Sequence, residues 1–206
     1  MNQPKLLALL AVALGALPIA SSQADLDLTP RYATSDHPAQ DDFQRLYFSN
    51  GDEEPVIIKP DHHTTVTGGS GETTLQFNNL QGASLLLRNS PLRPDLSFSE
   101  ANLETYRATA RQFAPQGQLK VVKESEEIDI SLKNIWDASV FTTTYALPGS
   151  EVTQSVTFIN YTPKQQIVLV LSAFSNEFED AQSRMDQILR TWSSMSPERL
   201  RLPDDN

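Results

Sequence analysis

The hydrophobic pattern is most regular in the last third of the chain, where residues 152–195 read as two strands followed by one long amphipathic helix. In the helix, apolar side chains recur every three or four residues, which places them on one face. These residues are Phe178, Ala181, Met185, Ile188, Leu189 and Trp192. Residues 167–171, Ile-Val-Leu-Val-Leu, are an unbroken apolar run typical of a central strand covered on both faces. The pattern therefore predicts a sheet with a helix packed on it.

Both predicted helices carry capping signals at their ends. Asn176 is the predicted N-cap of the final helix, and Pro197 is predicted to stop it. Residues 96–113 predict a first helix, with Ser97 or Ser99 as its cap. Its apolar stripe gives it the same role as the final helix, which is to cover a sheet.

Short runs rich in Thr, Val, Leu and Phe, separated by turns, predict the strands of that sheet. The predicted strands before the central one are residues 62–67, 72–78, 83–88, 119–124, 128–132, 139–147 and 152–160. Connections this short join antiparallel neighbours, because a parallel return needs a crossover of a dozen or more residues. Residues 68–71, Gly-Gly-Ser-Gly, lack the Lys-Ser/Thr and the helix that follow in a phosphate-binding loop, so they predict a hairpin turn. The predicted fold class is α+β.

The N-terminus has the pattern of a secretory signal peptide. Lys5 precedes an apolar run over residues 6–19, and a small-x-small site predicts cleavage after Ala24. The run is shorter than the roughly 20 residues of a spanning helix, so no membrane insertion is expected after removal of the signal. The predicted location is periplasmic or secreted. An acidic, Pro-rich extension over residues 25–61, one domain over residues 62–195 and a polar tail over residues 196–206 are predicted to follow.

Charge and cysteine content restrict the possible partners and cofactors. The chain carries a formal net charge of −10, and removing the signal takes away only Lys5 among its charged residues. Such an acidic surface repels nucleic acid and anionic lipid, so neither is an expected partner. The chain contains no cysteine, which excludes disulfides and thiolate metal ligands, and its stability must come from a packed core.

The histidines and the aspartates beside them form the only cluster with metal-ligand character. Asp61, His62 and His63 are consecutive, and Asp36 and His37 lie upstream. His62 and His63 fall at the start of a predicted strand, where adjacent side chains point to opposite faces. A solvated strand end is therefore favoured over a shared metal ion, and no metal or cofactor residue is predicted. A metal-binding protein or enzyme that uses His62 and His63 is kept as an alternative.

No set of residues predicts catalysis. The chain has no cysteine nucleophile and no Gly-x-Ser-x-Gly elbow. The carboxylates of Glu124, Glu126, Glu127 and Asp129 fall at a predicted hairpin joint, where charges are usually solvated. No catalytic residue is predicted.

Aromatic residues offer one candidate surface. Phe141 and Tyr145 share one face of a predicted strand, and Trp136 precedes them. They are predicted to form core under the helices, and an uncovered sticky patch is the alternative. Asn160 opens an Asn-Tyr-Thr glycosylation sequence, which is discounted because Pro163 follows and the signal has bacterial character.

The order of these features resembles the Mog1/PsbP-like superfamily, and most closely the DcrB-type and DUF1795-type bacterial proteins within it. The likeness covers roughly residues 62–195. It rests on Leu-Ser-Phe-Ser-Glu-Ala-Asn-Leu-Glu-Thr-Tyr (96–106), on Ser-Ala-Phe (172–174) leading into Phe-Glu-Asp-Ala (178–181), and on Ile-Leu-Arg-Thr-Trp (188–192). Thr191 and Trp192 stand where Ser-Phe is usual, and a glycine expected near residues 136–139 is absent.

The resemblance implies an α/β/α sandwich around an antiparallel sheet and no enzymatic residues. Proteins of this superfamily act mostly by binding, so the expected function is that of an exported, non-enzymatic accessory protein of the bacterial envelope with an unidentified protein partner. A small apolar ligand carrier, with a cavity between sheet and helices, is a further alternative.

Overall fold

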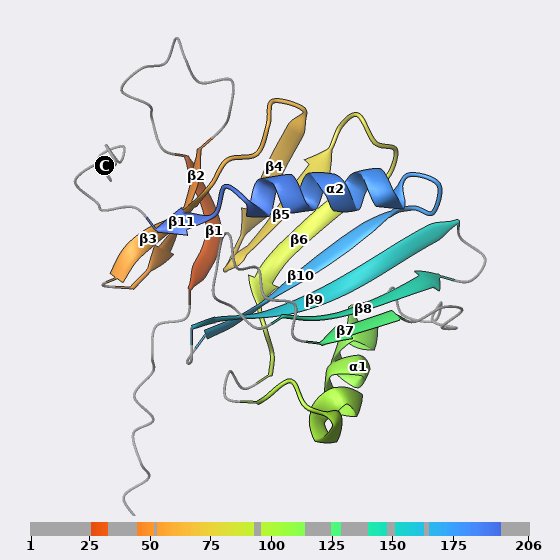
Figure 1. Cartoon of the computed structure of the whole chain (residues 1–206). Coiled ribbons are helices and arrows are strands. Elements are labelled where there is room, and N and C mark those ends of the chain that lie inside the picture. Colours follow the sequence, from red (N-terminus) through yellow and green to blue (C-terminus); the bar gives the residue numbers. More distant parts are fainter. Residues whose placement is uncertain are drawn as a thin grey trace, which may run out of the picture.

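The computed structural model describes residues 26–32, 45–51, 53–92, 96–113, 125–128, 140–147, 151–162 and 165–194. These residues form a mixed α+β fold with two antiparallel sheets and two α-helices (Figure 1). The larger sheet has seven strands in the order β4-β5-β6-β10-β9-β8-β7, and the smaller has four in the order β1-β2-β3-β11. The fold class predicted from the sequence is confirmed at this level.

All but one of the strands of the large sheet follow the predicted segments closely; the exception, over residues 125–128, falls in the joint between the predicted strands 119–124 and 128–132 and shares only Ile128 with them. The strands are β4 (Thr64–Gly69), β5 (Glu72–Phe77), β6 (Ser84–Asn89), β7 (Ser125–Ile128), β8 (Val140–Leu147), β9 (Val152–Thr162) and β10 (Gln165–Phe174). The predicted central strand is the middle strand of the seven, because β10 pairs with β9 on one side and with β6 on the other. The predicted strand over residues 119–124 lies outside the described residues.

Alternate residues of β10 face two separate hydrophobic cores. Ile167, Leu169 and Leu171 belong to one core, and Val168 and Val170 to the other. This alternation follows from the pleat of a strand, which sends successive side chains to opposite faces. The unbroken apolar run therefore serves two layers, as its pattern predicts.

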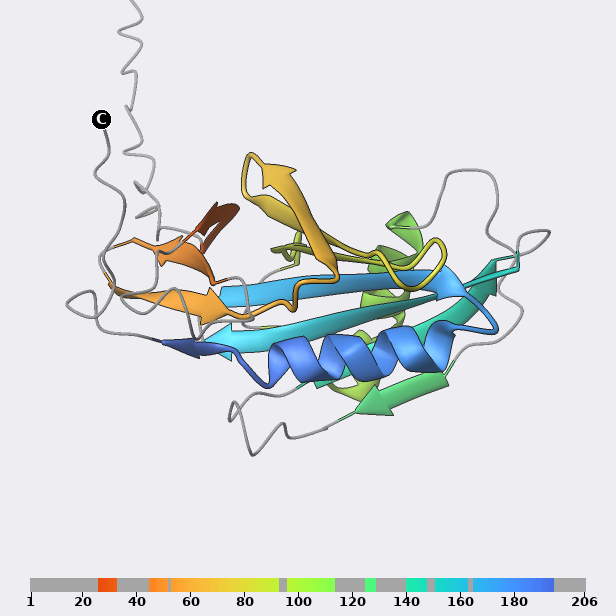
Figure 2. The same cartoon turned by 90° about the horizontal axis from the view of Figure 1, so that it is seen from above.

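One face of the large sheet is covered by helix α2 (Phe178–Leu189) together with the small sheet. The small sheet contains β1 (Asp27–Tyr32), β2 (Leu46–Asn50), β3 (Glu53–Ile58) and β11 (Ser193–Ser194). Figures 1 and 2 show the chain leaving the end of α2 and entering the small sheet as β11. Phe48 and Ile58 from the small sheet share this core with Met185 and Ile188 from α2.

The opposite face is covered by helix α1 (Leu103–Gln112), which follows the short 3-10 helix η1 (Glu100–Asn102). Tyr106 and Ala110 of α1 pack there with Phe141, Tyr145 and Phe158 of the sheet. The prediction that Phe141 and Tyr145 are core is confirmed: they are 0% and 1% exposed. They lie under α1 alone, however, because α2 belongs to the other core.

Both helices are shorter than predicted. Glu177 occupies the N-cap position of α2 and no side chain caps it, so the predicted Asn176 cap is wrong. At α1, neither Ser99 nor Asn102 makes a side-chain cap hydrogen bond. Helix α2 ends at Leu189, well before Pro197, because Trp192 turns into the core against Phe48 and the next two residues pair with β3.

The predicted boundary at residue 62 does not separate an extension from a domain. Strands β1, β2 and β3 lie within residues 25–61, and Leu28, Leu46 and Val56 are fully buried in the core that α2 covers. Because β3 also pairs with β11, the two ends of the described chain close one sheet. The signal peptide and the polar tail fall outside the described residues.

Candidate functional site

The segment that contains the two adjacent histidines is a turn and not a strand. The Asp61 Oδ1 atom accepts hydrogen bonds from the backbone N–H of His63 (2.9 Å) and from the Thr64 hydroxyl (3.0 Å). The Thr64 N–H also donates to the Asp61 carbonyl (3.1 Å). Asp side chains favour such local bonds over a strand ladder. The prediction of a strand beginning at His62 is therefore wrong, since β4 begins at Thr64.

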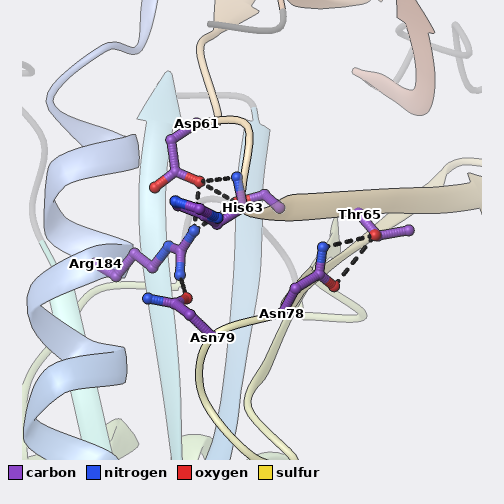
Figure 3. A network of polar contacts seen from close by, with 7 residues as sticks. Asp61, His63, Thr65, Asn78, Asn79 and Arg184 are labelled. Atoms are coloured by element: carbon purple, nitrogen blue, oxygen red, sulfur yellow. Dashed lines mark hydrogen bonds and ion pairs between the residues drawn. The ribbon is translucent and has the colours of Figure 1, made fainter. Parts of the chain in front are cut away.

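A buried arginine from α2 holds this turn in place (Figure 3). The Arg184 side chain is 8% exposed and forms an ion pair with Asp61, whose side chain is 30% exposed. Its guanidinium also donates to Asn79 Oδ1, in the turn between β5 and β6, and lies over the Phe77 ring at 4.9 Å from the centroid. One side chain thus connects α2 with the turns on either side of the β4–β5 hairpin.

The Asp61 carboxyl is kept ionised by this arrangement. Partial burial acts to raise its pKa, but the hydrogen bonds from Arg184 and Thr64 and the charge of Arg184 outweigh burial. The pKa of Asp61 therefore lies below its ordinary value. The result is a neutral ion pair at the base of the turn.

The imidazole rings of His62 and His63 lie side by side in the turn. Their centroids are 3.9 Å apart, with an angle of 48° between the planes, and both residues are exposed. Among the described residues, no three His, Asp or Glu side chains are placed to hold a metal ion together. His37 and Asp36 lie outside the described residues.

Among the strands that the structure describes, β4 and β7 are the outermost of the large sheet. Strand β4 has the sequence Thr-Thr-Val-Thr-Gly-Gly, without a charge, whereas β7 has Ser-Glu-Glu-Ile. Glu126 and Glu127 therefore occupy a strand position and not the predicted hairpin joint; Glu124 and Asp129 lie outside the described residues. Charges on an edge strand hinder pairing with another strand. By this criterion, β4 can accept an additional strand more readily than β7 can.

The β4–β5 hairpin ends in a tight turn formed by Ser70 and Gly71, which confirms the predicted hairpin at residues 68–71. Both residues have positive φ, 56° and 83°, as a type I′ turn requires. Strand β1 lies against this turn, because the N–H of Gly71 donates to the Thr29 hydroxyl (2.9 Å) and the Thr73 hydroxyl donates to the Leu28 carbonyl (2.6 Å).

Two tyrosine hydroxyls attach α1 to its neighbours. Tyr106 donates to the Leu96 carbonyl (2.7 Å) and accepts from Gln166 Nε2 (3.1 Å), and burial raises the pKa of this phenol despite the bond from Gln166. Tyr145 lies within donating distance of the Ala110 carbonyl (3.0 Å) and Gln154 Oε1 (2.8 Å). Both tyrosine hydroxyls are hydrogen-bonded to other groups of the protein, as is usual for buried polar groups that stabilise a fold.

The remaining sequence candidates do not gather into a site. Asn160 Oδ1 accepts a hydrogen bond from Gln166 (2.7 Å), so its amide belongs to the packing around Tyr106. Trp136 lies outside the described residues. The arginine at position 184 and the glutamines at 154 and 166 were not among the candidates from the sequence.

None of the helices in the described part of the chain is long and apolar enough to cross a membrane. Comparison of the sequence with protein-family models finds no matching family, and comparison with curated proteins finds no matching protein.

Proposed function

We propose that this chain is an exported, non-enzymatic binding protein of the bacterial envelope that takes up an extended strand of a partner protein along the outer edge of β4. The observation that carries the proposal is the contrast between the two edges of the large sheet. The fold is proposed to be of the Mog1/PsbP-like kind, which is supported by two helices that cover opposite faces of one antiparallel sheet.

The hydrogen-bond pattern of the hairpin identifies the backbone groups that would bind the strand. The N–H of Asn78 donates to the His63 carbonyl (2.9 Å), and Thr64 pairs with Phe77 in the register. Residues opposite each other in an antiparallel pair alternate between bonded and non-bonded pairs. It follows that Thr65 and Thr67 turn their backbone groups toward β5.

Val66 and Gly68 consequently turn their N–H and C=O groups away from β5, toward the outer edge. The other neighbour of β5 agrees with this assignment. The N–H of Phe77 donates to the Ala83 carbonyl (3.0 Å), so the β5 residues that bond to β6 alternate with those that bond to β4. An added strand would bond to Val66 and Gly68, as in recognition by strand addition. Strand β4 carries neither a charge nor a proline that would oppose this addition.

The composition of β7, at the opposite side of the sheet, disfavours the addition of a strand. Glu126 and Glu127 are two of the four residues of β7. Half of the residues of this strand are therefore acidic, and the chain as a whole has a net charge of −10. Charges on an edge strand are a common protection against unwanted pairing.

Site-specific photo-crosslinking in cells of the native host tests the proposal. A photoreactive residue at Thr67 on β4 is expected to give a discrete adduct with one protein. The same residue at Glu126 on β7 or at Gln182, exposed on α2, should give none. Equal adducts from all three positions, or an adduct from β7 alone, would contradict uptake at β4.

A further inference from the structure

The paired histidines of the turn form a second candidate site, separate from the β4 edge. We propose that His62 and His63 together bind one divalent transition-metal ion, and that Cu²⁺ binds more tightly than Zn²⁺. Both rings are exposed and lie in contact, with centroids 3.9 Å apart. The strand geometry that would have separated them is absent, because β4 begins only at Thr64.

The separation of the rings is close to that of a metal-bound pair. With metal–nitrogen bonds of about 2.0–2.1 Å, two imidazoles that share one ion have centroids roughly 4.5–5 Å apart. The observed pair therefore needs to open by about half an ångström to one ångström to reach this geometry. Rotation about the side-chain torsions of two exposed residues provides such a movement without a change in the backbone.

The turn itself is held by groups that the metal would not disturb. Asp61 Oδ1 receives the bonds from His63 N–H, from Thr64 and from Arg184 that fix the backbone of the turn. The Arg184 charge is balanced by Asp61, so an approaching cation meets a neutral pair. A fixed backbone lowers the entropic cost of bringing two ligands to one ion.

The donor set decides which ions bind. Two imidazole nitrogens suit Cu²⁺, Ni²⁺ and Zn²⁺, and affinity for such nitrogen sites is greatest for Cu²⁺. Mg²⁺ and Ca²⁺ prefer oxygen ligands and are not expected to bind here. Because no third protein ligand converges among the described residues, water completes the coordination.

Metal titration of the untagged mature chain tests the proposal, with native mass spectrometry for stoichiometry and calorimetry for affinity. The expected result is one Cu²⁺ per chain, with Zn²⁺ bound at least tenfold more weakly. The His62→Ala/His63→Ala double variant should lose this ion, and each single variant should bind at least tenfold more weakly. The matched control is His37→Ala, which removes the third histidine of the chain and should bind like the wild type.

Nuclear magnetic resonance locates the ion independently of affinity. Cu²⁺ is paramagnetic, so substoichiometric addition should broaden the amide signals of residues 61–64 first. Three results would overturn the proposal. They are an unchanged Cu²⁺ affinity in the double variant, no Cu²⁺ uptake by the wild type, and broadening centred on the acidic start of α2. The two proposals can fail separately. If the chain binds no metal but the Thr67 crosslink forms, only the metal proposal fails; if metal binds but no crosslink forms, only the β4 proposal fails.

Discussion

Arg184 of α2 forms an ion pair with Asp61, in the turn before β4, although 123 residues separate them in the sequence. The pair connects the last helix with the turn that leads into β4, and His63 of the same turn lies beside it (Figure 3). Both proposed binding surfaces therefore depend on the same buried guanidinium. Its removal is the most informative test of how the fold supports them.

Replacement of Arg184 by Met should destabilise the protein by about 2–3 kcal/mol, because it leaves the partly buried Asp61 carboxylate without its cation. Urea unfolding measures the change. The control is Arg190→Met, an exposed residue at the end of the same helix, which should change the free energy of unfolding by less than about 0.5 kcal/mol. Equal unfolding midpoints for the two variants would show that the pair does not stabilise the fold.

The stabilisation by Asp61 should depend on pH with a definite sign. The pKa of Asp61 is lowered in the folded state, so its contribution is fully present above the unfolded pKa of about 3.9 and is lost as the pH falls through the folded value. The difference in unfolding free energy between the wild type and Asp61→Asn should be constant from pH 7 to pH 5 and shrink below about pH 4. Urea unfolding at several pH values measures this difference, with a chelator present so that no metal ion is bound. A difference that grows on acidification would contradict the assignment.

The two glycines that end β4 should respond differently to alanine. A Cβ at Gly68 would collide with the backbone carbonyl of Glu72 and lie 3.0 Å from Pro30 Cδ, whereas a Cβ at Gly69 meets nothing within 4 Å. Gly68→Ala is expected to cost about 1–3 kcal/mol, and Gly69→Ala is expected to be neutral or slightly stabilising. Thermal unfolding of the two variants measures the difference. Similar melting temperatures would mean that the backbone of β5 does not approach Gly68 as closely as described.

Proline at Val66 should block the edge and leave the sheet intact. The Val66 N–H faces away from β5, so its loss removes no ladder bond, and proline is tolerated on edge strands in that position. The matched variant Thr65→Pro removes an N–H that faces β5 and should cost about 3 kcal/mol or more. We expect Val66→Pro to remain folded by circular dichroism and to lose the Thr67 crosslink. A crosslink of unchanged yield would exclude backbone pairing at β4.

The parts of the fold that the sequence predicts are those set by local pattern. The apolar run of β10 and the apolar stripe of α2 both indicate their burial, because each pattern has the period of the element. The end of α2 is not predictable in this way, since Trp192 continues the helical spacing but packs between Phe48 and Tyr161 after the helix has ended. There, tertiary contacts decide the structure.

The small sheet and the buried arginine were missed for different reasons. Residues 46–48 and 56–58 are short unbroken apolar runs of the kind that forms buried strands, but the prolines and acidic residues around them favoured the interpretation as an extension. Arg184 interrupts the apolar stripe of α2, which is a local signal of a buried polar group. Its partners at positions 61, 64 and 79 are more than 100 residues away, so the sequence alone could not name them.

Amide hydrogen exchange of the β4 strand, with and without the protein captured by the Thr67 crosslink, tests strand uptake most directly. In the free chain, the amides of Val66 and Gly68 should exchange fast, and those of Thr65 and Thr67 should already be protected by β5. On complex formation, Val66 and Gly68 should become protected, while Thr65 and Thr67 change little. Protection that appears at β7 or over α2 instead, with Val66 and Gly68 still exchanging fast, would contradict the account.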